Sequence, residues 1–151
     1  MNDENNRFLL FSVGGEDYGT PLLTVREVVE YQTPKYIPNM DSAFSGVINI
    51  RGTIVGVLDL RQKFNANSTV QRGVALLVCD TEQGPIAAVV DQVKAVVVLP
   101  DDKIEKQPPV RTQVKKDFVI GVAKLEDQLV TLIDLLSALS AEKILGERGK
   151  K

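Results

Sequence analysis

Residues 46–60 read GVINIRGTIVGVLDL, residues 121–135 read GVAKLEDQLVTLIDL, and the two stretches align without a gap. Each begins with Gly-Val, passes through a polar turn and reaches Asp-Leu thirteen residues after its glycine. A repeat of this length indicates two similar structural units packed together. The two turns differ, because the first carries Arg51 beside a glycine and the second carries Glu126 and Asp127.

Each half of the chain is expected to open with one hairpin and to close with the repeated one. Residues 8–13 and 74–79 are largely apolar runs, each followed by turn-forming residues and a second extended segment. The expected strands are rich in Val, Ile and Leu on both faces, which suits small barrels that also pack against each other. We therefore predict a mainly β fold of two five-stranded units with a hydrophobic seam between them.

Short helices are expected after both copies of the repeat. Asp59 begins a capping-box pattern that predicts a brief helix, and Asp134 stands in the same position before a helix expected over residues 135–145. Thr24 and Glu27 have the same spacing, which predicts a further short turn of helix.

The composition is that of an ordinary soluble globular protein, with 151 residues of which 44% are apolar and 25% charged. The longest uninterrupted apolar stretch, residues 74–79, is far too short to span a bilayer. Residues 1–7 lack the basic start and apolar region of a signal peptide. A net charge of -2 with scattered basic residues gives no nucleic-acid footprint. We expect a cytoplasmic protein without direct membrane insertion or nucleic-acid binding.

The chain contains no histidine, which removes histidine-based acid–base catalysis, histidine metal ligands and phospho-histidine relays. Its one cysteine, Cys79, lies in an apolar run and is expected to be a buried small hydrophobic residue. Asp59 and Asp134 could act as paired catalytic carboxylates, but both are better suited to cap the helices that follow. We expect no catalytic residue, metal site or cofactor. A small enzyme using these carboxylates is the alternative from another functional class.

Arg51 and Glu27 each admit two interpretations. Arg51 lies at a hairpin tip where the second copy carries acids, so the fold does not require a cation there. It is either a solvated arginine or a rigid anchor for a partner's carboxylates or helix-end carbonyls. Glu27 either closes the capping box or is a surface acid near Arg51 on one recognition face. Val25, Val28 and Val29 are more apolar than a short helical turn needs. Core packing explains some of them, and an exposed apolar groove would explain the rest.

Five segments occur together in a characteristic order. They are FLLFSV at 8–13, VREV at 25–28, GVINIRG at 46–52, VLDLR at 57–61 and VVDQV at 89–93. Together they resemble the CheW-type coupling proteins of bacterial chemotaxis, and GVINIRG is the most specific of them. The resemblance covers one CheW-like domain over residues 8–145. The internal repeat places its two β-subdomains at about 8–66 and 74–145, and strand exchange between them is possible. Residues 1–7 and 146–151 are expected to be flexible termini.

The resemblance implies two SH3-like β-barrel subdomains in a non-catalytic adaptor that couples chemoreceptors to the chemotaxis histidine kinase in membrane-associated arrays. The implied partners are the CheW-like regulatory domain of the kinase and the cytoplasmic hairpin tip of the receptor. A same-fold adaptor of a different chemosensory-like kinase pathway, for motility or biofilm control, is the alternative. By resemblance, the receptor-binding positions are Val25, Glu27, Val28, Gly46, Asn49, Arg51 and Val96.

Two positions depart from the family pattern. Gly56 stands where the family usually has proline, and Gln92 stands where it usually has glycine. Gly56 adds backbone freedom beside the repeated hairpin, whereas Gln92 removes a permissive turn position. Neither position belongs to the Arg51 turn, so these departures concern local geometry more than the adaptor role.

Overall fold

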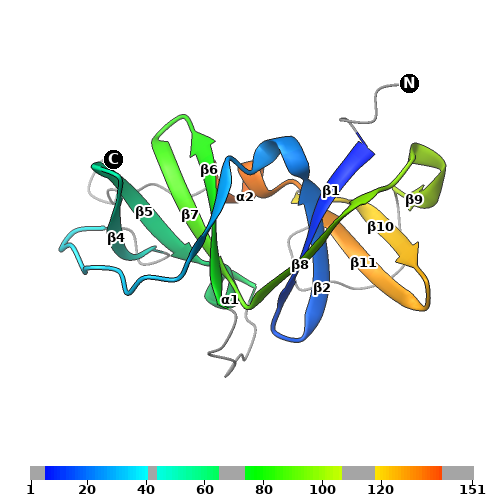
Figure 1. Cartoon of the computed structure of the whole chain (residues 1–151), viewed down its shortest axis with the longest axis horizontal. Helices are drawn as coiled ribbons and strands as arrows, with labels where there is room; N and C mark the ends of the chain where they lie inside the picture. Colours follow the sequence, from blue (N-terminus) through cyan, green and yellow to red (C-terminus); the bar gives the residue numbers. More distant parts are fainter. Residues whose placement is uncertain (1–5, 41–43, 65–73, 107–117, 141–151) are drawn as a thin grey trace, which may run out of the picture.

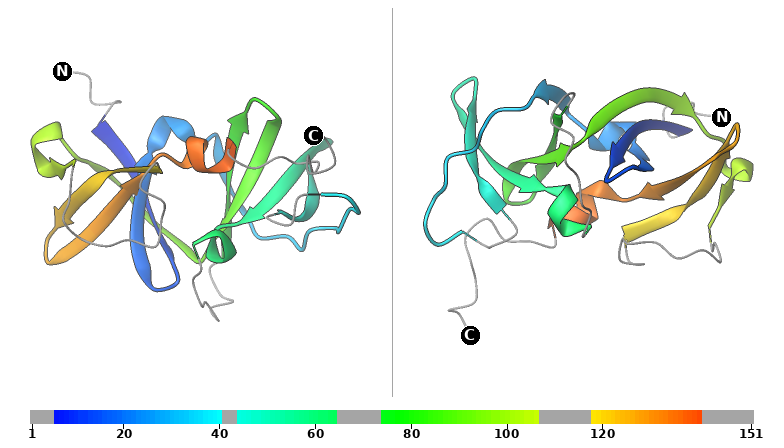
Figure 2. Two further views of the ribbon diagram at one scale, coloured as in Figure 1. Left: turned by 180° about the vertical axis from the view of Figure 1, so that it is seen from behind. Right: turned by 90° about the horizontal axis from the view of Figure 1, so that it is seen from below.

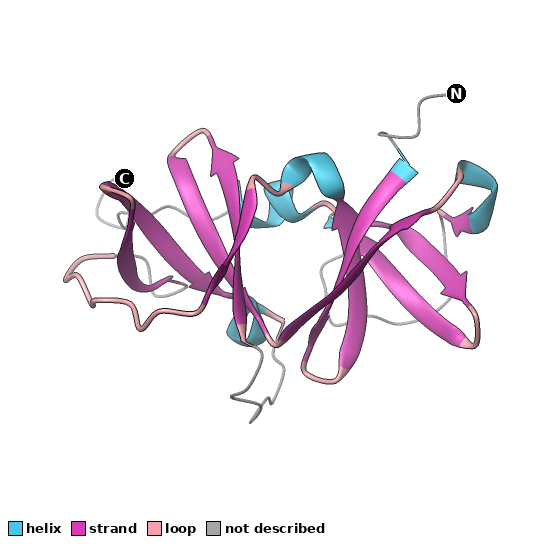
Figure 3. Ribbon diagram, viewed as in Figure 1, coloured by secondary structure: helices cyan, strands magenta, loops and turns pink. Residues whose placement is uncertain are grey.

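The computed structural model describes residues 6–40, 44–64, 74–106 and 118–140, which form two β-sheets side by side along the longest axis of the molecule (Figure 1). The six-stranded sheet has the spatial order β8 (Gln92–Val98), β1 (Arg7–Val13), β2 (Glu16–Pro21), β11 (Gln128–Ile133), β10 (Val119–Leu125) and β9 (Ile104–Glu105). The five-stranded sheet has the order β3 (Glu27–Glu30), β6 (Ala75–Thr81), β7 (Gly84–Val90), β5 (Thr53–Asp59) and β4 (Phe44–Ile50). The expected mainly β architecture of two subdomains is confirmed (Figure 3). One sheet has the five strands expected of each unit, and the other has a sixth because the two-residue β9 pairs with β10.

The chain crosses between the two sheets twice. It begins with β1 and β2 in the six-stranded sheet, builds the whole five-stranded sheet from β3 to β7, and returns with β8 to β11. The first repeat hairpin, β4–β5, therefore shares a sheet with β6–β7, and the second, β10–β11, shares one with β1–β2 (Figure 2). The sheets thus do not follow the boundaries 8–66 and 74–145, because the hairpin that opens each half pairs with the repeat hairpin of the other half.

The two repeat hairpins have the same local architecture. Each contains a register shift next to its opening glycine, between Phe44 and Gly46 in β4 and between Val119 and Gly121 in β10. The second strand of each hairpin then pairs in parallel with a strand of the opening hairpin, β5 with β7 and β11 with β2. The internal repeat in the sequence therefore corresponds to a structural repeat.

The opening glycine of each copy is required by a backbone segment that crosses it. A Cβ atom added to Gly46 would overlap the carbonyl oxygen of Lys35, and one added to Gly121 would lie 2.6 Å from the carbonyl oxygen of Glu105. Lys35 exchanges two backbone hydrogen bonds with Val47, and Glu105 belongs to β9, which pairs with β10. Only glycine permits this close approach of two backbones.

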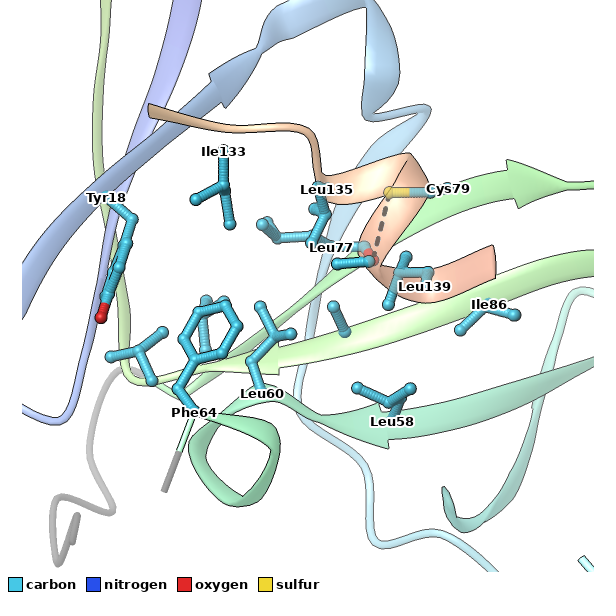
Figure 4. Packing of buried hydrophobic residues seen from close by; sticks show 14 of the residues in the cluster. Tyr18, Leu58, Leu60, Phe64, Leu77, Cys79, Ile86, Ile133, Leu135 and Leu139 are labelled. Carbon is cyan, nitrogen blue, oxygen red and sulfur yellow. Dashed lines mark hydrogen bonds between the residues drawn. The ribbon is translucent and has the colours of Figure 1, made fainter. Parts of the chain in front are cut away.

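The largest hydrophobic cluster lies between the sheets. Figure 4 shows members of this cluster from both sheets, with Tyr18 and Ile133 from the six-stranded sheet and Leu58 and Leu77 from the five-stranded sheet. Two smaller clusters are each formed by side chains from one sheet and its flanking residues. In β6, Leu77 faces the cluster between the sheets while its neighbour Leu76 faces the cluster within its own sheet. Burial on both faces explains why these strands lack a clear alternation of apolar and polar residues.

Cys79 is buried in the cluster between the sheets, as expected. Burial raises the pKa of its thiol to about 12, with a smaller contribution from the carboxylate of Asp80. The thiol therefore stays protonated and unreactive near neutral pH.

The helices that follow the two repeat copies begin where the sequence predicts. The Asp59 side chain accepts a hydrogen bond from the backbone N of Arg61 at 2.9 Å and caps α1 (Leu60–Lys63). The Asp134 side chain accepts from the backbone N of Ser137 at 3.2 Å in α2 (Leu135–Ser140). The remainder of the helix expected over 135–145 lies outside the described residues.

The helical turn predicted from Thr24 and Glu27 is wrong. Thr24 ends a 3-10 turn, η2 (Leu22–Thr24), whereas Glu27 is the first residue of β3. The backbone N of Arg26 donates to the carbonyl oxygen of Val78 at 2.7 Å, and β3 continues this antiparallel pairing with β6. Pairing with a distant strand thus overrides the local capping pattern.

Candidate functional site

Arg51 stands on a tightly constrained hairpin turn. It has φ 49° and the following Gly52 has φ 87°, and this pair of positive values is what a two-residue hairpin turn of type I′ requires. The Asn49 side chain supports the turn by accepting a hydrogen bond from the backbone N of Gly52 at 2.8 Å. The Arg51 side chain is 69% exposed. The sequence therefore places an accessible cation on a rigid support.

The Arg51 guanidinium forms an ion pair with Glu27, whose Oε2 lies 2.5 Å from Nη2. Glu27 begins β3, and Arg51 follows β4. These two strands occupy opposite ends of the strand order in the five-stranded sheet. The ion pair therefore connects the two edges of that sheet, and the acid and the cation expected near each other are in contact.

Arg26 and Asp80 extend this ion pair into a chain of alternating charges. Arg26 Nε lies 3.6 Å from the same Glu27 oxygen, and Arg26 Nη1 donates to Asp80 Oδ1 at 2.7 Å. Exposed pairs of this kind contribute about 0–1 kcal/mol each to stability, so their main effect is on side-chain geometry. Arg26 and Asp80 were not among the residues expected at this site. Arg26 could have been identified only from its adjacency to Glu27, and no local signal in the sequence indicates Asp80.

The other predicted site residues contribute in different ways. Val28 is 46% exposed on β3 beside Glu27, and Val25 is half-buried against the cluster between the sheets. Gly46 is buried under the Lys35 backbone and can act only through the shape of β4. Val96 is 50% exposed on β8, an edge strand of the other sheet. Glu27, Val28, Asn49 and Arg51 therefore lie on the five-stranded sheet, and Val96 lies across the boundary.

The proposed carboxylate pair has a structural explanation. Asp59 bonds Arg61 and the start of α1, and Asp134 bonds Ser137 in α2. The described part of the chain contains no group of three metal-binding side chains. Among the described residues no helix is both long enough and apolar enough to cross a membrane. The chemistry that the Arg51 turn offers is recognition, through a fixed charge on the same sheet as the exposed apolar side chain of Val28.

Known proteins resemble this chain over nearly its whole length. The CheW-like domain family matches residues 7–143. The chemotaxis protein CheW of Klebsiella aerogenes is 30% identical over 138 residues, covering 91% of this chain and 83% of that protein. CheW of Bacillus subtilis is 25% identical over 140 residues, covering 90% and 88%. The structure of the scaffolding protein TtCheW from Thermoanaerobacter tengcongensis matches with a TM-score of 0.82 at 28% identity, covering 94% of each chain.

Proposed function

Because the chain belongs to the CheW-like family, and its relatives include chemotaxis and scaffolding proteins, we propose that it couples chemoreceptors to the chemotaxis histidine kinase. In this proposal it is a cytoplasmic adaptor without enzymatic activity or cofactor, recruited to membrane-associated receptor arrays. One surface binds the CheW-like regulatory domain of the kinase, and a second binds the cytoplasmic hairpin tip of the receptor. The weak individual contacts are reinforced by the multiplicity of the array.

The observation that carries the proposal is the exposed Arg51 on its constrained turn, held by Glu27. A helical hairpin tip presents carboxylates and helix-end carbonyls, and a guanidinium binds both through several N–H donors at once. Val28 beside this turn offers apolar contact, and Val96 on β8 extends the face to the second sheet. Holding the cation in place before binding lowers the entropy lost when the complex forms.

The proposal is tested by replacing Arg51 with glutamate. Arg51→Glu is expected to weaken receptor-hairpin binding by ~1–3 kcal/mol, as for an interface anchor, and to leave the protein folded. The fold should tolerate the acid because Glu126 adopts φ 55° at the equivalent turn of the second copy. Isothermal titration with a purified receptor hairpin fragment measures the affinity, and circular dichroism checks the fold.

Two further variants separate recognition from local structure. Glu126→Arg changes the equivalent turn in the other sheet and should leave receptor affinity unchanged. The double variant Glu27→Arg with Arg51→Glu restores an ion pair between the two sheet edges but inverts the charge presented to the receptor, so binding should stay weak. Unchanged receptor affinity in a folded Arg51→Glu protein would rule out this placement of the site.

A further inference from the structure

Asp91 occupies the second crossing between the sheets. It is the single residue between β7 and β8, at the point where the chain leaves the five-stranded sheet for the six-stranded one. Its backbone N donates to the carbonyl oxygen of Ser12 at 2.9 Å, and its Oδ2 accepts from the backbone N of Gly14 at 2.7 Å. Ser12 lies in β1 and Gly14 in the turn that follows. The carboxylate is thereby fixed to the six-stranded sheet.

Arg61 reaches the same carboxylate from the five-stranded sheet. It lies in α1, directly after β5, and its Nε and Nη2 donate to the two oxygens of Asp59 at 2.9 Å each. This two-point contact fixes the plane of the guanidinium. The remaining nitrogen, Nη1, then lies 3.5 Å from Asp91 Oδ1. Asp59 therefore directs Arg61 across the boundary between the sheets.

These three side chains are much less exposed than the ion pairs around Arg51. The exposed fractions are 17% for Arg61, 12% for Asp59 and 5% for Asp91. Charges at partly buried positions interact more strongly than surface charges, and removing one partner leaves the others uncompensated. The hydrogen bond to Asp59 raises the pKa of Arg61, which keeps the guanidinium charged. Without this cation, Asp59 would lose its two-point contact and Asp91 would lose its link to α1.

We propose that Arg61 is a positioning residue whose pairing with Asp91, together with the hydrophobic core between the sheets, sets the orientation of the two sheets and so holds both parts of the receptor-binding face in register. Glu27 lies on β3, which follows the first crossing, and Val96 lies on β8, which begins immediately after Asp91. The face can present both strands to one partner only while the sheets keep one orientation. This inference rests on the proposed function, which supplies the identity of the partner. The orientation of the sheets does not depend on that function.

The orientation is measured by the distance between spin labels on the two sheets. Glu82→Cys in the β6–β7 turn and Asp127→Cys in the β10–β11 turn provide exposed sites, one on each sheet. Cys79 can remain, since it is buried and its pKa is raised to about 12. Adding Arg61→Met should shift or broaden the distance distribution. A control pair within the six-stranded sheet, Glu16→Cys with Asp127→Cys, should give the same distribution with and without Arg61→Met.

Asp91→Asn provides a second variant that keeps an oxygen acceptor for Gly14 and replaces the carboxylate oxygen facing Arg61 by an uncharged amide nitrogen. It should change the distance between the sheets in the same direction as Arg61→Met. The combined variant should change it no further, because both substitutions break one contact. Arg61→Lys keeps a charge and should recover part of the wild-type distribution. These comparisons separate a specific pairing from a general loss of stability.

Receptor-hairpin affinity is then measured on the same proteins without labels. Arg61→Met should weaken binding by roughly threefold to thirtyfold, the range for substitutions that alter coupling without touching the ligand. An unchanged distance distribution would overturn the inference, and so would unchanged receptor affinity in a protein whose sheets have moved. Failure of the wild-type protein to bind the hairpin would instead contradict the proposed function. The distance measurement would still decide whether Arg61 sets the orientation of the sheets, because it requires no receptor.

Discussion

Gly46 and Arg51 lie five residues apart in the same repeat copy, and their identities have different physical origins. Gly46 and its counterpart Gly121 are both crossed by a backbone carbonyl oxygen, so the fold requires glycine at both positions. Arg51 and its counterpart Glu126 share a left-handed backbone conformation but carry opposite charges. The left-handed conformation of the first turn residue is therefore common to both copies, and the charge at this position is available for recognition.

Replacing Gly46 tests the structural half of this distinction. Gly46→Ala should lower the free energy of unfolding by about 2–3 kcal/mol, because φ is 147° and the new Cβ would overlap the Lys35 carbonyl oxygen. Gly52→Ala is the matched control, since φ is 87° but no atom lies within 4 Å of the added Cβ. It should cost only about 1–2 kcal/mol of backbone strain. Equal losses in urea denaturation would contradict the role assigned to the crossing segment.

At the scale of elements, the two helix caps differ in what each aspartate holds. Asp134 accepts hydrogen bonds from the backbone N and from the hydroxyl of Ser137, and both of these bonds are exposed. Asp59 caps its helix and in addition makes the two-point contact with the guanidinium of Arg61. The same residue at equivalent positions of the repeat therefore serves a local role in α2 and a longer-range role in α1.

Truncating both caps should reveal this difference. Asp134→Ala should cost about 1 kcal/mol, the usual value for a lost N-cap. Asp59→Ala should cost at least about twice as much, because it also leaves Arg61 without its main partner at a partly buried site. Chemical denaturation of the two variants measures both losses. Equal losses would show that the Asp59–Arg61 contact adds nothing to the cap.

Local signals in the sequence predicted local structure well and distant pairing poorly. Turn residues predicted the hairpins, and Asp59 and Asp134 predicted helix starts, because each signal acts within a few residues. No turn residues in the sequence indicate the parallel pairing of β5 with β7 or of β11 with β2. The sequence therefore could not decide whether the two halves exchange hairpins. Thr24 and Glu27 misled for the same reason, since a distant strand decides their conformation.

The residues of the candidate site show the same difference between local signals and distant pairing. A position of Glu27 near Arg51 was one of the two interpretations of Glu27, and the two side chains are in contact. Arg61 and Asp91 were not identified as a pair, although both lie within segments that carry the resemblance. They are 30 residues apart and meet only where the sheets adjoin, so no spacing in the sequence connects them.

For the whole molecule, the continuous core between the sheets makes the two subdomains one body. The rings of Phe11, Tyr18 and Phe64 lie in contact within this core, with centroids 6.0 Å and 5.2 Å apart along the series. Phe64 follows α1 in the five-stranded part, whereas Phe11 and Tyr18 belong to the six-stranded sheet. A rigid body of this kind is what the proposed binding of two partners at once requires.

The most direct test of the adaptor role is whether both partners bind one molecule of the protein simultaneously. The CheW-like regulatory domain of the kinase and a receptor hairpin fragment are titrated separately, and each is then titrated in the presence of a saturating amount of the other. We predict a ternary complex in analytical ultracentrifugation and affinities for each partner that change little when the other is bound. Displacement of one partner by the other, or no binding of either, would contradict the account.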